Sequence, residues 1–264
     1  MTAPPGGAAW AAPAPEPKPG AQRPSGPGAW PPSSVLAADP ATVEAPDAVA
    51  VAATCPTPSP GVHRSAPGSG KTVALTFDDG PGASTAAIVA ILEDAGVAAT
   101  FLNIGVNSTV RPALVRAEAT QGFLLGNHTW SHPDMTTLSA AAQASEMDKA
   151  SAEQNSLVGY PPCFFRPPYG QFSEHSYKAC EAMGLQPVYW SAWGLDWEDI
   201  GPDRIADLVV RDLGPGAVVV LHDSPRYADR PSAQATAQAI PAIAAAAADQ
   251  GLKWATLTQV LGSE

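Results

Sequence analysis

The pattern of hydrophobic and polar residues after residue 70 alternates between two kinds of segment. Short runs rich in β-branched and apolar residues are typical of buried strands, and longer stretches with helical spacing follow them and end near glycines. The predicted strands lie at residues 71–77, 99–104, 123–127, 163–166, 186–190, 217–222 and 253–257. The predicted helices lie at residues 84–95, 110–121, 139–159, 173–183 and 203–213, with a last helix that ends at Gly251.

This alternation predicts an α/β fold with about seven parallel strands, in a sheet that is either open or curled into a barrel. No repeat of the sequence accompanies the alternation, so a repeat architecture is not expected. Residues 71–264 are long enough to bury a sizeable core. We therefore expect them to form one domain.

Residues 1–70 have a different composition, in which more than half of the residues are Pro, Ala or Gly. Such a segment has too few large apolar side chains to offset the entropy lost on ordering, and we expect a disordered tail or linker. It shows no clear signal peptide, because Met1–Trp10 has no basic residue and no apolar run follows. Tethers of this composition are common in exported proteins, so we expect a secreted or cell-wall-associated protein.

The formal net charge of −11 narrows the choice of partners. An acidic chain repels phosphate groups, which argues against nucleic acid and against anionic membrane surfaces. No run of 18 apolar residues occurs, so we expect no membrane span. We expect a monomer that acts on a neutral or weakly charged substrate.

Three cysteines leave two interpretations open. Cys55 belongs to the tail, whereas Cys163 and Cys180 fall in the domain and could either pair or remain buried thiols. If the protein is exported, we expect a Cys163–Cys180 disulfide that braces the loop containing Arg166 and Tyr169. Closing a loop of that size would add about 3 kcal/mol to the free energy of unfolding.

Chemically reactive residues follow several predicted strands, and the carboxyl ends of parallel strands are where α/β folds build their sites. Two histidines, His128 and His132, are four residues apart, so on one turn of helix both could reach one ion. Asp79 would be a third ligand, and this set leaves coordination positions open for catalysis. Its neighbour Asp78 could hold a water for metal-assisted hydrolysis. The alternatives are a chance histidine pair and an ordinary Asp-Gly turn.

Two further segments carry candidate chemistry. Arg166 begins a rigid Arg-Pro-Pro-Tyr segment and offers a planar fork to a carboxylate. His222 ends the most apolar predicted strand. The alternatives are an exposed arginine before a turn and a histidine satisfied at a strand end.

Five segments occur in an order that resembles the motifs of the polysaccharide deacetylases, the NodB-homology domain of carbohydrate esterase family four. The segments are Thr76-Phe-Asp-Asp-Gly80, His128-Thr-Trp-Ser-His132, Arg166-Pro-Pro-Tyr169, Asp196-Trp197 and Leu221-His222. The resemblance covers roughly residues 71–261. It implies a distorted (β/α) barrel of about seven strands and one divalent metal ion, often zinc and sometimes cobalt or another ion.

The resemblance also implies roles for the residues of the first three motifs. Asp79, His128 and His132 resemble the metal ligands. Asp78 resembles the general base that deprotonates the reacting water, and Arg166 resembles the residue that orients this base. These roles suit amide hydrolysis, which needs a polarised carbonyl and an acceptor for the proton of water.

The remaining matches complete the implied machinery. Tyr169 resembles the residue whose backbone N–H helps to hold the oxyanion. His222 resembles the general acid that protonates the leaving amine, and Asp196 resembles its partner. Trp197 and Val220 would form walls of the acetyl pocket.

One position departs from the family pattern. An acidic residue often stands three places before the Asp of Asp-Trp, and this chain has Trp193 there. Trp193 could stack on a sugar ring or could pack in the core.

Taken together, the motifs make the leading hypothesis a metal-dependent hydrolase that removes N-acetyl groups from chitin oligosaccharides or peptidoglycan. The alternatives are an O-deacetylase such as an acetylxylan esterase, and a carbohydrate-binding relative without turnover.

Overall fold

The computed structural model describes residues 55–56, 58, 61–66 and 70–261. Most of the predicted disordered tail, residues 1–54, lies outside the described residues. Eight strands form one sheet in which every strand pair is parallel. They are β1 (Thr72–Asp78), β2 (Thr100–Asn103), β3 (Leu124–Asn127), β4 (Phe164–Phe165), β5 (Gln186–Pro187), β6 (Ala192–Trp193), β7 (Val218–His222) and β8 (Lys253–Ala255).

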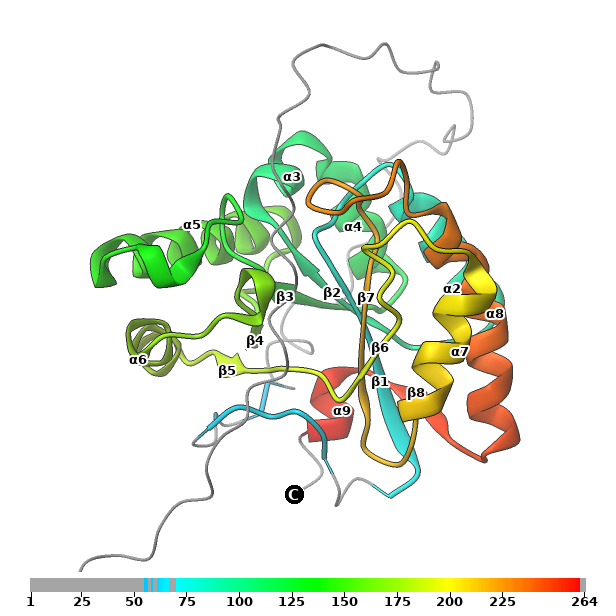
Figure 1. Cartoon of the computed structure of the whole chain (residues 1–264). Helices are drawn as coiled ribbons and strands as arrows, with labels where there is room; N and C mark the ends of the chain where they lie inside the picture. The colour runs from blue at the N-terminus through cyan, green and yellow to red at the C-terminus, as the bar shows by residue number, and fades with distance from the viewer. Residues whose placement is uncertain (1–54, 57, 59–60, 67–69, 262–264) are drawn as a thin grey trace, which may run out of the picture.

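Helices follow most of the strands and cover the outside of the sheet (Figure 1). They are α2 (Thr85–Asp94), α3 (Gly105–Val110), α4 (Pro112–Thr120), α5 (Ala140–Val158), α6 (Glu174–Met183), α7 (Pro202–Asp212), α8 (Gln234–Asp249) and α9 (Leu257–Leu261). Two short 3₁₀ turns, η1 (Met135–Thr137) and η2 (Pro168–Gly170), lie in the loops after β3 and β4.

The sheet follows the order β5-β4-β3-β2-β1-β7-β6, and β8 pairs with the first half of β1. It curls into a half-barrel, which confirms the predicted α/β fold with parallel strands. The sequence pattern identified each strand except β6. That strand stands between Ser191 and Gly194, which leave no apolar run or alternation around its two residues.

Alternation along the central strands sends neighbouring side chains to opposite faces. Val73, Leu75 and Phe77 of β1 pack in a core cluster with α2, α7 and α8. Ala74 belongs to a second cluster on the other face, inside the curl of the sheet. By the same period, Asp78 at the end of β1 faces the interior of the half-barrel.

Local capping agrees with the predicted helix ends in part. Ser173 and Ser176 form a reciprocal capping box at the start of α6, and Gly184 ends that helix in the left-handed conformation. The predicted helix 110–121 is wrong at its start: α3 ends at Val110 and α4 begins with Pro112. Ser84 stands at the start of α2, but its side chain makes no capping hydrogen bond.

The predicted Cys163–Cys180 disulfide is wrong. Cys163 is bonded to Cys55, with a Cα–Cα distance of 5.4 Å, and Cys180 is a free, buried thiol. Cys163 directly precedes β4 and contacts the interior core cluster, whereas Cys180 on α6 packs in a third cluster with Met135 and Met147. Spacing along the chain could not show that the two side chains enter different clusters.

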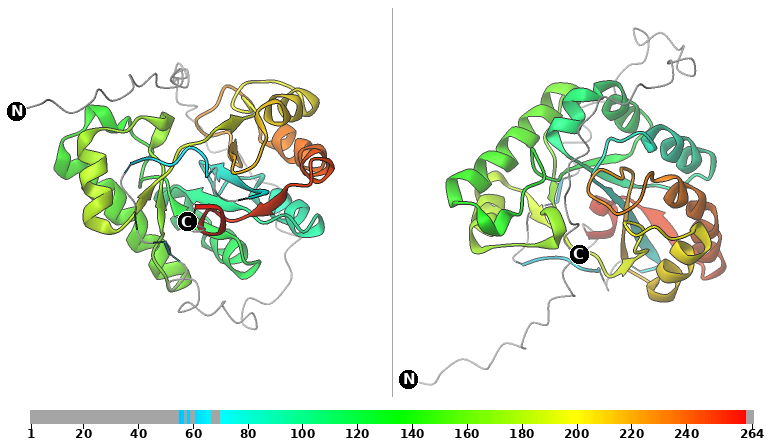
Figure 2. Two further views of the ribbon diagram at one scale, coloured as in Figure 1. Left: turned by 90° about the horizontal axis from the view of Figure 1, so that it is seen from below. Right: turned by 45° about the horizontal axis from the view of Figure 1, so that its top comes forward.

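Residues 61–66, which we name the strap, pack on the half-barrel. His63 forms a parallel bridge with Val188, and Ser65 forms an antiparallel bridge with Ala217. In the view from below, the blue strap crosses between the green half of the sheet and the yellow and orange half (Figure 2). The strap therefore links the β5 side of the open sheet to the start of β7, a contact that composition did not predict.

Within the described residues, no helix combines the length and the hydropathy that crossing a bilayer requires.

Candidate active site

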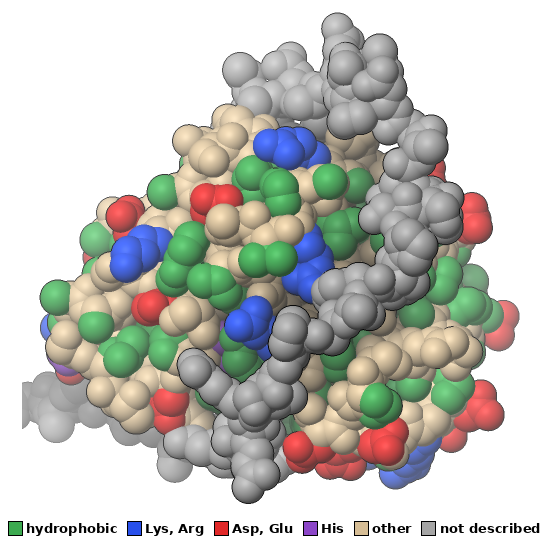
Figure 3. Space-filling view, turned by 90° about the horizontal axis from the view of Figure 1, so that it is seen from above, with side chains coloured by type: hydrophobic (Ala, Val, Ile, Leu, Met, Phe, Trp, Pro, Cys, Tyr) green, Lys and Arg blue, Asp and Glu red, His purple; other side chains and the backbone are tan. Residues whose placement is uncertain are grey.

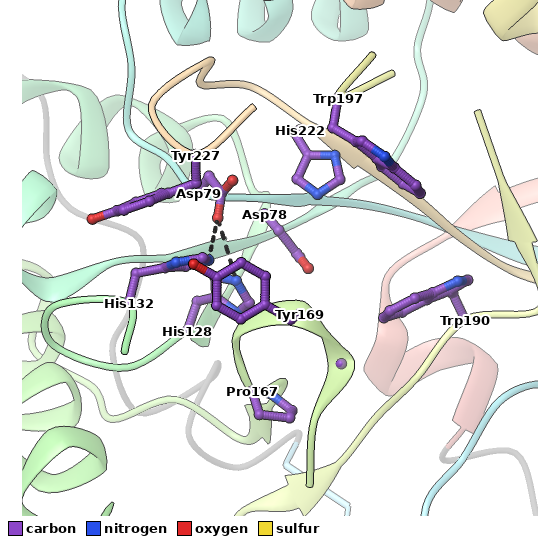
Figure 4. A pocket seen from close by; sticks show the side chains of 11 residues that line it. Asp78, Asp79, His128, His132, Pro167, Tyr169, Trp190, Trp197, His222 and Tyr227 are labelled. Carbon is purple, nitrogen blue, oxygen red and sulfur yellow. Dashed lines mark ion pairs between the residues drawn. The ribbon is translucent and has the colours of Figure 1, made fainter. Parts of the chain in front are cut away.

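The candidate site lies at the carboxyl ends of the strands, where the loops after β1, β3, β4 and β7 meet (Figure 4). Figure 3 shows the molecule from above, with hydrophobic and basic side chains mixed over the middle of the described surface and acidic ones mostly toward its margins. The residues that line the pocket are Asp78, Asp79, His128, His132, Pro167, Tyr169, Gly170, Trp190, Trp197, His222 and Tyr227.

Three lining residues form a cluster suited to a metal ion. His128 Nε2 and His132 Nε2 lie 3.4 and 3.1 Å from Oδ1 of Asp79, and all three side chains are buried. Burial alone would raise the pKa of Asp79, but His132 and His128 outweigh it and hold that pKa well below its usual range. Burial lowers the pKa of His132, which favours the neutral imidazole that binds metals.

The donor set fits a divalent cation. Among the described residues, Oδ1 of Asp79 and Nδ1 of His132 are buried and have no hydrogen-bond partner. Nδ1 of His128 lies 2.7 Å from the carbonyl oxygen of Arg166, so a proton on Nδ1 leaves the lone pair of Nε2 facing Asp79. Metal-binding histidines commonly donate their second N–H in this way. Two imidazole nitrogens and one carboxylate oxygen, with positions left open, suit a catalytic zinc or a similar ion.

The two histidines meet through a loop and not through the helical turn predicted from their spacing. Residues 128–132 follow β3, and Thr129 and His132 both have positive φ values, 68° and 60°. The side chain of Asn127 accepts a hydrogen bond from the amide of Thr129 at 2.8 Å. Thr129 Oγ1 then accepts from the amide of His132 at 3.0 Å. These two bonds fold the loop back so that both imidazoles face Asp79.

A glycine permits the close approach of α3 to this loop. The amide of Gly105 donates to the carbonyl of Thr129 at 3.0 Å. A Cβ atom on Gly105 would stand 2.4 Å from the ring of Trp130. Any larger residue would push the histidine loop away from α3, so the position of His132 depends on this glycine.

Asp78 is held by a buried arginine. Nη1 of Arg166 donates to Oδ1 of Asp78 at 2.7 Å and to Oγ1 of Thr76 at 2.8 Å. The arginine has no exposed surface, and Thr76 and Asp78 point to the same side of β1 because they are two residues apart. This arrangement fixes the carboxylate of Asp78 beside the Asp79, His128 and His132 side chains.

His222 is paired in the register of the sheet with Asp78 and faces the same pocket. Its Nδ1 lies 2.9 Å from Oδ1 of Asp196, and its backbone amide donates to Oδ2 of Asp196 at 2.9 Å. Burial alone would raise the pKa of Asp196, but Arg230 and His222 outweigh it and bring it to about 2. Asp196 is therefore an anion that stabilises a proton on His222.

The chain is also similar to known proteins. The family model of the polysaccharide deacetylases matches residues 65–188. The chain is 36% identical over 155 residues to a chitooligosaccharide deacetylase from Bradyrhizobium, covering 58% of this chain and 71% of that protein. The chain belongs to the polysaccharide deacetylase family.

Two further members are similar. A peptidoglycan-N-acetylglucosamine deacetylase from Bacillus cereus is 36% identical over 154 residues, which cover 58% of this chain and 56% of that relative. The chain thus matches little more than half the length of this relative. The crystal structure of the Bc1960 peptidoglycan N-acetylglucosamine deacetylase superposes with a TM-score of 0.72 and 30% identity, covering 77% of this chain and 94% of that one.

Aromatic rings form the walls of the pocket in this family member. The ring of Trp197 stands edge-on to His222 with centroids 5.6 Å apart. Tyr169 contacts the opposite side of the pocket, with its ring 4.9 Å from that of His132. Trp193 and Val220, expected at the substrate, are not among the lining residues. Val220 is fully buried in the interior core, and the half-buried Trp193 packs against that core.

Sequence reasoning missed two wall residues. Trp190 lines the pocket from the segment between β5 and β6. Tyr227, in the loop after β7, stacks on His132 with centroids 3.8 Å apart and an interplanar angle of 15°. The sequence pattern predicts a strand that includes Trp190, and Tyr227 stands five residues beyond His222 in a polar loop. Nothing in the local pattern of either residue signals a place in the pocket.

Left-handed backbone conformations concentrate at this deacetylase-family site. Within the described residues, the non-glycine residues with positive φ are Asp79, Thr129, His132, Tyr169 and Leu195. Three of them line the pocket, and Leu195 directly precedes Asp196. Such residues are costly and persist only where the surrounding structure holds them, which is common at functional sites.

Proposed function

We propose that this chain is a metal-dependent hydrolase that removes N-acetyl groups from a polysaccharide, with chitin oligosaccharides or peptidoglycan glycan as substrates. The observation that carries the proposal is the convergence of three elements in one pocket: the Asp79–His128–His132 cluster, the carboxylate of Asp78 and the imidazole of His222. Relatives that act on peptidoglycan and on chitooligosaccharides support both substrate classes.

Asp79, His128 and His132 would hold the metal ion, which we propose to be zinc, with cobalt as an alternative. When bound, this ion polarises the acetyl carbonyl and lowers the pKa of water, as divalent ions do in metal-assisted hydrolysis. The proposal requires no ligand beyond these three from the chain, since open positions serve substrate and water.

Asp78 accepts the proton of the attacking water. Its Oδ1 is engaged by Arg166, so we assign proton acceptance to Oδ2. Arg166 contributes by holding the carboxylate in one orientation. A base fixed in this way needs no rearrangement before it receives the proton.

His222 donates a proton to the leaving amine. Its Nδ1 faces Asp196, so the donating atom is Nε2. The anionic Asp196 stabilises the imidazolium, and Arg230 and Thr236 in turn hold Asp196 through its Oδ2. The backbone N–H of Tyr169 would stabilise the negative charge that develops on the acetyl oxygen.

The disulfide supports a location outside the reducing cytoplasm. Cys55 and Cys163 are joined, and such bonds persist in secreted or cell-surface proteins and are rare in the cytosol. We therefore propose a secreted or cell-wall-associated enzyme, which is also where chitin and peptidoglycan are found.

The test is acetate release from chitin oligosaccharides, peptidoglycan and acetylxylan, measured side by side with and without a chelator. We expect chelator-sensitive release from at least one N-acetylated glycan. Release from acetylxylan alone would favour the O-deacetylase, and zinc binding without release from any substrate would favour a carbohydrate-binding relative.

Variants test the assigned roles. Asp79→Ala should lose metal and activity together, whereas Asp78→Asn should keep metal while kcat falls about 100-fold or more. His222→Ala should keep metal and should slow amides more than activated esters, because a good leaving group needs no proton. Exposed Asp148 and His175 provide matched controls, Asp148→Asn and His175→Ala, which should behave as wild type. Loss of metal in Asp78→Asn would contradict the division of roles.

A further inference from the structure

The strap contacts a residue that the deacetylase mechanism above does not use, Tyr189. The carbonyl of His63 accepts a hydrogen bond from the amide of Tyr189 at 2.7 Å. The guanidinium of the next strap residue, Arg64, lies 4.4 Å from the centre of the Tyr189 ring. Tyr189 is only 5% exposed. The strap therefore holds both the backbone and the ring of this tyrosine.

The other two polar groups of Tyr189 reach the catalytic loop after β4. Its carbonyl oxygen accepts from Nη2 of Arg166 at 2.9 Å. Its hydroxyl donates to the carbonyl oxygen of Gly170. Gly170 directly follows Tyr169, whose N–H is assigned to the oxyanion. One buried residue thus connects the strap to the partner of the base and to the oxyanion loop.

The contact with Arg166 fixes the rotation of the guanidinium. Nη1 is shared between Asp78 and Thr76, and the planar fork of arginine then directs Nη2 to one place only. The carbonyl of Tyr189 occupies that place. If this carbonyl moved, the guanidinium would rotate and its bond to Asp78 would weaken.

The contact with Gly170 supports a strained turn. Tyr169 and Gly170 both have positive φ values, 59° and 63°. A Cβ on Gly170 would stand 3.0 Å from the ring of Tyr189 and 2.6 Å from that of Trp190, so the turn is already packed closely on both rings. The hydroxyl of Tyr189 adds a directional bond between its ring and the turn, and it thereby restrains the short loop that carries the Tyr169 N–H.

We propose that Tyr189 is a positioning residue for the deacetylation, and that the strap, fastened by Cys55–Cys163, holds Tyr189 in place. The inference rests on the proposed function. It adds that the base and the oxyanion donor are aligned together through one tyrosine, and that this alignment depends on an oxidised N-terminal segment.

The first experiment compares Tyr189→Phe with Tyr177→Phe. Tyr177 stacks on Phe172, the ring that Tyr189 also contacts, but it does not line the pocket. Tyr189→Phe should lower kcat about 10-fold, with KM and metal content unchanged, because a buried hydrogen bond of this kind aligns groups without binding substrate. Tyr177→Phe should stay within about twofold of wild type. Equal effects of the two variants on kcat would overturn the proposal.

The second experiment loosens the strap with Cys55→Ala and uses Cys180→Ala as the control. Activity is measured well below the unfolding transition of each variant. Cys55→Ala should lower kcat with KM and metal content unchanged, and combining it with Tyr189→Phe should lower kcat by less than the product of the two effects. Wild-type kcat in folded Cys55→Ala would overturn the role of the strap.

Hydrogen exchange separates a failure of this inference from a failure of the proposed function. In the zinc-loaded protein, the amides of Arg166, Tyr169, Gly170 and Gln171 should exchange faster in Tyr189→Phe and in Cys55→Ala than in the two control variants. If the wild type releases no acetate, the proposed function fails, while exchange still reports whether Tyr189 and the strap hold the loop. Unchanged exchange in both variants would overturn the positioning role even in an active enzyme.

Discussion

Replacing Cys55 by Ala should cost the domain a large share of its free energy of unfolding. The bond joins residues 108 positions apart. In the chain-entropy treatment, a closed loop of about 100 residues removes enough freedom from the unfolded chain to stabilise the fold by about 4 to 5 kcal/mol. Since domains of this size are stable by about 5 to 15 kcal/mol, the loss should be obvious in any unfolding experiment.

Urea unfolding of oxidised wild type, Cys55→Ala and Cys180→Ala measures this cost. With a slope of about 2 kcal/mol per molar urea, Cys55→Ala should lower the midpoint by about 2 M. Cys180 is buried but unpaired, so Cys180→Ala should cost only the packing of one sulfur, about 1 kcal/mol. The slope should also rise in Cys55→Ala, because an unlinked chain exposes more surface on unfolding.

Thiol labelling decides the pairing independently. Burial raises the pKa of the Cys180 thiol to about 12, so it should resist alkylation in the folded protein. Unfolded protein that has not been reduced should take up one label, at Cys180, and reduced protein should take up three. A loss below about 1 kcal/mol in Cys55→Ala, or three labels without reductant, would refute the reasoning.

Three further outcomes are expected. Burial alone would raise the pKa of Asp196, but Arg230 and His222 outweigh burial and bring that pKa to about 2. The charge of Asp196 therefore stabilises the fold above pH 4 by about 2 kcal/mol. The advantage of wild type over Asp196→Asn in urea unfolding should disappear as pH falls from 4 to 2. Gly216→Ala should lower Tm by about 5 °C or more, because φ is 75° and the new Cβ would stand 2.1 Å from the carbonyl oxygen of Ala66; an unchanged Tm would contradict the strap contact. Removing metal with a chelator should lower Tm as well as activity, and zinc should restore both in wild type but not in Asp79→Ala.

The sequence could predict the features that depend on short stretches of chain. Parallel strands place their carboxyl ends at one edge, so Asp78 and His222, each at the end of an apolar run, were expected to converge without knowledge of the sheet order. In the structure they are register partners on β1 and β7. Alternation along β1 also accounts for the shared face of Thr76 and Asp78, between which Arg166 is held.

The remaining features depend on backbone exceptions and on contacts between distant segments. Four-residue spacing suggested a helical turn for His128 and His132, but left-handed φ values at Thr129 and His132 fold a loop there. The spacing of apolar residues carries no information about left-handed backbone conformations, because non-glycine residues rarely adopt them. The pairing of Cys55 with Cys163 was equally hidden, because proline-rich composition masked the contacts of residues 61–66.

Main-chain carbonyls orient the reactive groups of this pocket. The carbonyl of Arg166 fixes His128, while the side chain of the same residue fixes Asp78. The carbonyl of Tyr189 fixes Arg166, and that of His222 accepts from Arg230, which holds Asp196. A carbonyl moves only with its strand or loop, so the positions of His128, Asp78 and Asp196 are tied to the packing of β4, β7 and the segment after β5. The strap meets these contacts at Tyr189, whose amide donates to the carbonyl of His63, so a looser strap should act first on Arg166 and, through it, on Asp78.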